Sequence, residues 1–64
     1  MLNLNTNKKI RIAKFIAKSG LCSRRDAEIK VLNGEVSVDG ELITSPALNV
    51  SNQSVVIVDG ERIR

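Results

Sequence analysis

The sequence predicts an α+β fold in which two packed N-terminal helices lie on a small antiparallel β-sheet. Apolar residues follow a helical spacing of about 3.6 in the first half of the chain and an alternating, strand-like spacing after residue 35. Two Asp-Gly pairs, Asp39-Gly40 and Asp59-Gly60, mark tight turns between strands. Because the chain has only 64 residues, all of these elements must share one small core.

The first helix is predicted to begin near Ile10 or Ile12 and to end near Ser19. One inward face is expected from residues at i, i+3, i+4 and i+7, namely Ile12, Phe15, Ile16 and Ser19. Gly20 follows at the position where a helix often ends in a left-handed residue. Ahead of this helix, residues 1–9 are predicted to form a flexible basic tail, and residues 10–64 the folded domain.

The second helix is predicted over residues 24–32. Ser23 is expected to be its N-cap, because a serine hydroxyl can accept a hydrogen bond from a free N–H of the first turn. The pair 33–34, Asn-Gly, supplies the stop signal. Ala27 and Val31 are expected to share the inward face of this helix.

The sheet is predicted from three short apolar segments. Residues 36–38 alternate, the turn at Asp39-Gly40 reverses the chain, and residues 42–43 form the returning strand. Residues 49–54 are expected to be a polar loop. Residues 55–58 are β-branched and are expected to form the central strand.

Residues 36–43 and 56–63 are identical at six of eight positions. They could be a duplicated hairpin, or the same turn chemistry used twice on valine-rich strands.

Charge is distributed unevenly along the chain. Residues 1–32 contain eight Lys or Arg and two Asp or Glu. Residues 33–64 contain two Lys or Arg and five Asp or Glu. A basic first half suggests a polyanionic partner that docks there. The alternative is a solvated surface that happens to be uneven.

Catalysis by this chain is not expected. It has no His, Tyr or Trp, its carboxylates are scattered, and Ser23 has no base to activate it. Cys22 is the only cysteine, so no metal site, cofactor site or internal disulfide is expected, and a reduced cytoplasmic location fits best. No segment resembles a membrane span or a secretory signal. A monomer without a small-molecule substrate is expected.

A concentrated anion site is predicted where the two helices meet. Arg24 and Arg25 open the second helix, where free N–H groups and the positive end of the helix dipole also favour anions. The planar guanidinium of arginine suits bidentate contact with phosphate. Lys14 and Lys18 of the first helix should lie alongside. The competing interpretation is that the arginines are solvated or pair with nearby carboxylates.

Folded RNA is the expected partner. Phe15 is the only aromatic residue and is expected in the core, which disfavours the base stacking that single strands require. Arginine, lysine and N–H groups suit recognition of RNA by its backbone and shape. A helix-turn-helix that binds DNA remains an alternative, although no third helix is predicted.

The segment RIAKFIAKSGLCSRRDAEIKVLNGEVSVDGELITSP resembles the S-four RNA-binding domain, also called the αL motif. The pattern of this family contains R-[LI]-x-K-[FY]-[LI]-A, then G-[LIV]-x-S-R-R-x-A, then G-x-V-x-V-[ND]-G. The resemblance covers roughly residues 10–63 and implies two helices packed on a small sheet that bind structured RNA, commonly ribosomal RNA or tRNA.

The resemblance also implies which residues contact RNA. The candidate RNA-binding residues are Arg11, Lys14, Ser23, Arg24, Arg25, Lys30, Asn33 and Gly34. For Lys30, the alternative is a helix residue that is simply solvated. Two positions depart from the family pattern. Glu35 stands where a basic residue or His is common, which should weaken contact there, and Lys30 stands where an apolar residue is usual.

The GLCSRR signature and the segment TSPALNV are most similar to the N-terminal domain of ribosomal RNA pseudouridine synthases. Those enzymes carry a catalytic aspartate in a separate domain. The resemblance therefore implies an RNA-targeting domain of such an isomerase. The alternative is a stand-alone ribosome-associated S-four protein.

Overall fold

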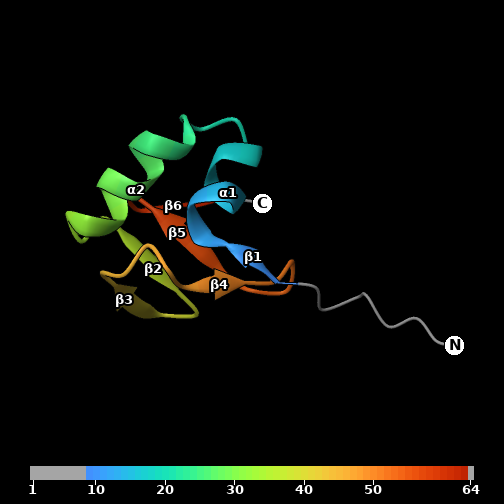
Figure 1. The fold of residues 1–64 in the computed structure, drawn as a ribbon. Helices are drawn as coiled ribbons and strands as arrows, with labels where there is room; N and C mark the ends of the chain where they lie inside the picture. The colour runs from blue at the N-terminus through green and yellow to red at the C-terminus, as the bar shows by residue number, and fades with distance from the viewer. Residues whose placement is uncertain (1–8, 64) are drawn as a thin grey trace, which may run out of the picture.

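The computed structural model describes residues 9–63, which form two layers (Figure 1). One layer holds the helices α1 (Ile12–Lys18) and α2 (Arg24–Leu32). The other is an antiparallel sheet in the order β3-β2-β5-β6, made of β2 (Val36–Val38), β3 (Glu41–Ile43), β5 (Val56–Val58) and β6 (Glu61–Ile63). This arrangement confirms the predicted α+β class. Neither helix in this part of the chain is long and apolar enough to cross a bilayer.

The core lies between the helices and one face of the sheet. Alternation along β5 turns Val56 and Val58 toward the helices, and both are buried, whereas Ile57 faces the other way and is half-exposed. The core is closed by buried apolar side chains from both layers: Ile12, Ala13, Ile16, Ala27, Val31, Val36, Val50, Val56, Val58 and Ile63. The predicted inward residues of α2, Ala27 and Val31, are therefore confirmed.

The helix α1 starts at Ile12, the later of the two predicted positions, and a short strand precedes it. Ile10 and Arg11 form a short strand, β1 (Ile10–Arg11), that pairs with β4 (Asn49–Val50), and the helix begins only at Ile12. The backbone N–H of Ile12 then donates to the carbonyl of Leu48 at 2.9 Å. The expected polar loop over 49–54 thus contains a strand. Its partner lies about 40 residues earlier in the chain, so local spacing gave no sign of the pairing.

The inward face of α1 is also rotated from the prediction. Ser19 is exposed and caps the helix end, where its hydroxyl donates to the carbonyl of Ile16. Ala13 is buried in its place, and Phe15 is only half-buried against the core. The helix α1 packs against α2 and also contacts β1 and β4, so more than one side of it is covered.

The two similar segments form matching hairpins. Each turns through an Asp-Gly pair with both residues at positive φ, with Asp39 at +54° and Gly40 at +85°, as a type I′ turn requires. The hairpins join through β2 and β5, which run antiparallel with Val36 opposite Val58. Asp39 N–H donates to the Val55 carbonyl, and the equivalent Asp59 N–H donates to the Glu35 carbonyl. A local two-fold axis therefore relates the hairpins.

Candidate nucleic-acid interface

The junction between the helices is short and capped. Gly20 at φ +87° ends the turn after α1, and five residues separate the two helices. Ser23 is in an extended conformation, and its hydroxyl accepts a hydrogen bond from the Asp26 backbone N–H at 3.1 Å. This confirms Ser23 as the N-cap of α2. The cap fixes where α2 begins, and thereby where Arg24 and Arg25 leave the backbone.

The outward side of α1 carries two lysines. Lys14 and Lys18 are exposed and lie one helical turn apart, opposite the buried side that carries Ile12 and Ile16. Both lysines were expected alongside the arginines, although only Lys14 was among the candidate RNA-binding residues. Their i, i+4 spacing places them on one side of the helix.

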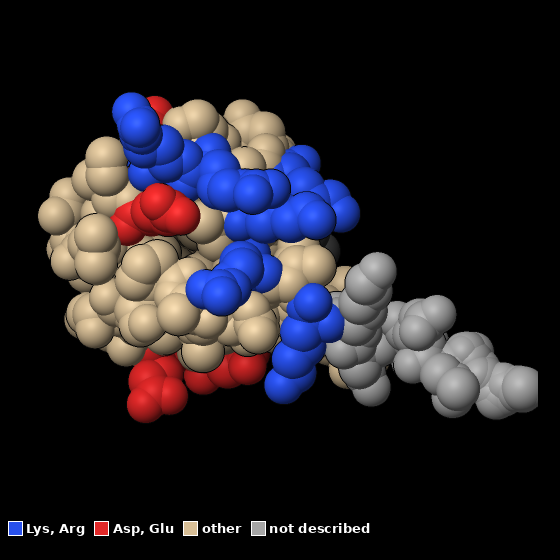
Figure 2. All heavy atoms as spheres, viewed as in Figure 1, with Lys and Arg blue, Asp and Glu red and all other residues tan. Residues whose placement is uncertain are grey.

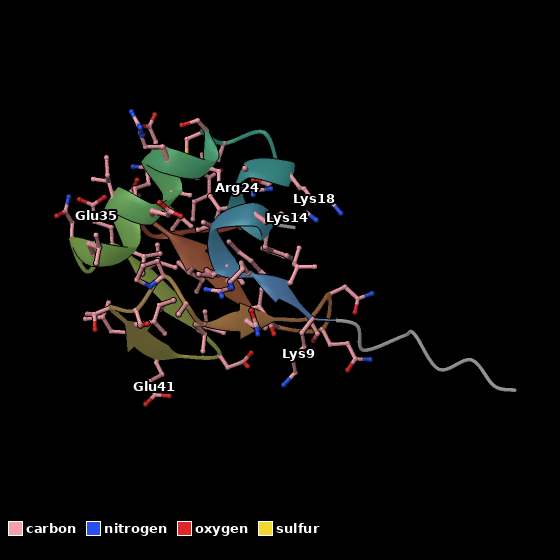
Figure 3. The ribbon with its side chains drawn as sticks, viewed as in Figure 1. Lys9, Lys14, Lys18, Arg24, Glu35 and Glu41 are labelled. Atoms are coloured by element: carbon pink, nitrogen blue, oxygen red, sulfur yellow. The ribbon has the colours of Figure 1, made fainter. Side chains whose placement is uncertain are left out.

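Arg24 and Arg25 point in different directions, because successive helical residues turn by about 100°. Arg24 lies seven residues before the buried Val31, so it shares the side of α2 that faces the rest of the fold. It lies near Lys14 and Lys18, where α1 and α2 pack together (Figure 3). Arg25 turns toward the outer side of α2, which also carries the exposed Ile29. Both arginines are exposed.

Arg11 contributes from a different element than expected. It is the last residue of β1 and the N-cap position of α1, and its backbone pairs with Asn49. Its side chain is exposed. The pairing of β1 with β4 therefore sets the position of Arg11.

The remaining predicted residues lie at the other end of α2. Asn33 is the C-cap, and Gly34 follows at φ +75° with its N–H bonded to the Val31 carbonyl. With a rise of about 1.5 Å per residue, Asn33 lies about 13 Å along the helix from Arg24. Lys30 is in the last turn. Lys30, Asn33 and Gly34 therefore form a second location, separate from the arginines.

Lys30 is held by two carboxylates. Its Nζ lies 2.8 Å from Asp59 Oδ2 and 3.6 Å from Glu35 Oε1. The two departures from the family pattern, Lys30 and Glu35, are therefore in contact with each other. Lys30 ties the end of α2 to the β5–β6 turn, and its ammonium group is already paired with protein carboxylates.

The Lys30–Asp59 contact predicts a pH dependence of stability. The hydrogen bond from Lys30 lowers the pKa of the Asp59 carboxyl. The same hydrogen bond, to Asp59, raises the pKa of the Lys30 ammonium group. A carboxylate with a lowered folded-state pKa stabilises the fold above its unfolded value, near 3.8, and loses this contribution as pH falls further. Asp59→Asn should therefore be less stable than the wild type at pH 7, with the gap closing below about pH 4.

Urea unfolding at pH 7 and at steps below pH 4 measures this gap. Glu61→Gln, which removes an exposed carboxylate in the neighbouring strand, is the control and should show no such closing. A wild-type advantage over Asp59→Asn that persists unchanged at the lowest pH would contradict the assigned role of the contact.

The exposed cations gather on one side of the molecule. Figure 2 shows Lys and Arg as a band across the helices that continues toward β1, with Asp and Glu mainly at its left and lower edges. The cationic face is defined here as Arg11, Lys14, Lys18, Arg24 and Arg25. Across residues 9–63 none of these five forms an ion pair with a carboxylate, because both ion pairs there belong to Lys30. Of the competing interpretation, the pairing of the arginines with carboxylates is therefore not seen among these residues, and their solvation stays an alternative.

Residues 10–56 match the model of the S4 domain family. This is the family called S-four in the sequence analysis. The chain belongs to the S4 domain family. Its two helices on an antiparallel sheet, with the Ser-Arg-Arg sequence at the start of α2, agree with this membership.

Relatives of this S4 domain are named RNA pseudouridine synthases. One from Rickettsia felis is 52% identical over 50 residues, covering 78% of this chain and 22% of that protein. One from Aquifex aeolicus is 39% identical over 57 residues, covering 88% of this chain and 23% of that protein. The chain thus spans less than a quarter of the length of these relatives.

Solved structures share the fold. A pseudouridylate synthase superposes with a TM-score of 0.74 at 24% identity, over 83% of this chain and 23% of that one. The 30S ribosomal protein S4e from Thermoplasma acidophilum superposes with a TM-score of 0.66 at 23% identity, over 88% of this chain and 30% of that one. At these identities the likeness establishes the S4 fold.

Proposed function

We propose that this S4 domain binds structured RNA, with ribosomal RNA as its natural class, through phosphate contacts from the cationic face. The observation that carries the proposal is five exposed cations without carboxylate partners in residues 9–63, displayed by two rigid helices and the strand beside them. Free N–H groups at the start of α2 add donors to the same face. In this proposal Ser23 orients these donors, and Arg24 and Lys14 bind neighbouring phosphates of one RNA backbone.

Recognition by backbone and shape suits this surface better than base stacking. Phe15, the only aromatic residue of the chain, is half-buried and packs against the core. No aromatic platform for successive bases is therefore exposed on residues 9–63. Folded RNA presents phosphates and 2′-hydroxyl groups, which arginine, lysine and N–H donors can bind directly.

The domain would serve to target a larger RNA pseudouridine synthase to its substrate. Support comes from relatives with that name, in which the matching region is about a fifth of the protein. In this arrangement the S4 domain supplies affinity and orientation, and the isomerisation takes place elsewhere in the enzyme. Reading the coding frame beyond residue 64 tests this part directly, since a following aspartate-bearing domain is required.

The RNA assignment is tested by competition at several salt concentrations. A labelled folded fragment of ribosomal RNA should be displaced by unlabelled folded RNA far better than by duplex DNA of equal length. With about four phosphates neutralised, log affinity should fall against log salt with a slope of roughly −3 to −4. Equal displacement by duplex DNA would favour the helix-turn-helix alternative and refute the RNA assignment.

A further inference from the structure

A hollow of about 290 Å³ lies beside the lower end of the cationic face. It is formed where the β2–β3 hairpin meets β4 and the loop that follows. Its lining includes three apolar side chains, the half-buried Val38 and Ile43 and the buried Val50. Pockets for drug-sized ligands run from about 300 to 1,000 Å³, so this hollow suits a group the size of one nucleobase.

One wall of the hollow offers hydrogen-bond acceptors. Asp39 uses Oδ1 to accept the Val55 backbone N–H at 2.9 Å, and its Oδ2 has no partner among residues 9–63. Glu41 also lines the hollow, is exposed and has no ion-pair partner in the same part of the chain. Two carboxylates on one wall favour a ligand that presents N–H groups to them.

The 51–54 loop, which adjoins Asp39 through Val55, offers donors. The Ser51 hydroxyl accepts the Gln53 N–H, and the Ser54 hydroxyl accepts the Ser51 N–H, so each keeps its own hydrogen to donate. Both serines line the hollow. Acceptors beside donors, with apolar side chains in the same hollow, match a planar ring whose edge carries an amino group next to a carbonyl or ring nitrogen.

Lys9 connects the hollow to the cationic face. It lines the hollow, is exposed, and is separated from Arg11 only by Ile10 at the start of β1. In Figure 3 Lys9 lies below β1 and Glu41 below β3. An RNA backbone that crosses the cationic face and contacts Arg11 can continue to Lys9, which brings its next nucleotide to the hollow.

We propose that this hollow holds one unpaired base of the bound RNA and selects bases with an exocyclic amino group, cytosine, adenine or guanine, over uracil. The amino group donates to Asp39 and Glu41. Uracil has a carbonyl in place of that amino group and offers a single N–H, at N3, so it can donate to only one of the two carboxylates. This inference rests on the proposed RNA binding and adds to it a site that reads base identity.

Nuclear magnetic resonance of the ¹⁵N-labelled chain, titrated with cytidine or uridine monophosphate, tests the proposal. Cytidine monophosphate should shift the backbone amides of Ser51, Ser54 and Val55, and its affinity there should exceed that of uridine monophosphate by about fivefold. Both probes carry the same phosphate, so contacts with the cationic face cancel in the comparison. Equal affinities, or shifts confined to α1 and α2, would overturn the base site.

The two-fold relation between the hairpins supplies a matched control. Glu41→Gln should abolish the preference for cytidine monophosphate, because an amide presents a donor as well as an acceptor. Glu61 occupies the equivalent place in the second hairpin and does not line the hollow, so Glu61→Gln should keep the preference. A preference that survives Glu41→Gln, or is lost in both variants, would refute the assignment.

The proposed function and the base site fail in different ways. If folded RNA does not bind with the expected salt slope, the proposed RNA binding by the cationic face is refuted. This conclusion does not depend on whether the monophosphates bind in the hollow. If folded RNA binds but the two monophosphates are not distinguished, the base site is wrong and the phosphate interface stands.

Discussion

Replacing both Arg24 and Arg25 with alanine is expected to weaken binding of folded RNA by roughly tenfold or more and to flatten its salt dependence. Each phosphate contact removed should reduce the log–log slope by about 1, so the double variant should lose about 2. The loss should be similar for RNAs of different sequence, because phosphates carry no sequence information. Filter binding or fluorescence anisotropy across a salt series measures both quantities.

A matched double variant separates the cationic face from net charge. Lys30→Ala with Arg62→Ala removes the same two charges from other places: Lys30 is paired with carboxylates, and Arg62 lies on the strand β6 opposite Ile57, on the sheet face away from the helices. For this double variant, the slope of log affinity for RNA against log salt should stay close to that of the wild type. Equal flattening by the two double variants would show that total charge governs binding and would contradict a localised interface.

The single variants should differ in a way that only the structure predicts. Arg24 lies near Lys14 and Lys18, whereas Arg25 turns about 100° away. A phosphate bound between the helices should therefore lie closer to Arg24 than to Arg25. Arg24→Ala should cost more affinity than Arg25→Ala, although the sequence presents them as an equivalent pair.

The largest effect on stability is expected from Ile16→Ala. Ile16 is fully buried between the helices and the sheet, and truncating such a side chain removes about 2–5 kcal/mol from the free energy of unfolding. A domain of this size has a total stability of roughly 3–10 kcal/mol. The variant should therefore unfold at much lower urea concentration and temperature than the wild type, and at the upper end of the range it should not fold at all.

Ile29→Ala is the control, because it makes the same truncation in the neighbouring helix. Ile29 is 48% exposed, and alanine has the higher helix propensity, so its unfolding free energy should change by less than about 0.5 kcal/mol. Chemical denaturation of both variants gives the comparison. Similar losses for Ile16→Ala and Ile29→Ala would contradict the assigned core.

Local signals predicted the helices and turns well because their causes are local. The bounds of α2 follow from the Ser23 cap and the Asn33-Gly34 stop, which act within one helical turn. Both hairpins follow from Asp-Gly pairs that accept positive φ. The candidate interface was predicted in part for the same reason, since Ser23, Arg24 and Arg25 are adjacent and their placement depends on one cap.

Long-range contacts account for what the sequence did not predict. Arg11 lies at the start of α1 as expected, but it is also the last residue of a strand, because its backbone pairs with Asn49. Lys30 was a candidate RNA contact, but its closest charged partner is Asp59, 29 residues away, so its removal is expected to leave the salt slope of RNA binding nearly unchanged. Neither contact leaves a periodic or adjacent pattern in the sequence.

The sequence by itself determined the α+β class, the bounds of α2, the two type I′ turns and the concentration of positive charge in the first half. Each depends on residues within a few positions of one another or on a simple count. Only the tertiary structure decided which cations share a face, that Lys30 is tied to carboxylates, and that a hollow lies beside Lys9. Those features arise where distant segments pack, and the direction of a side chain there is set by the partner rather than by its neighbours in sequence.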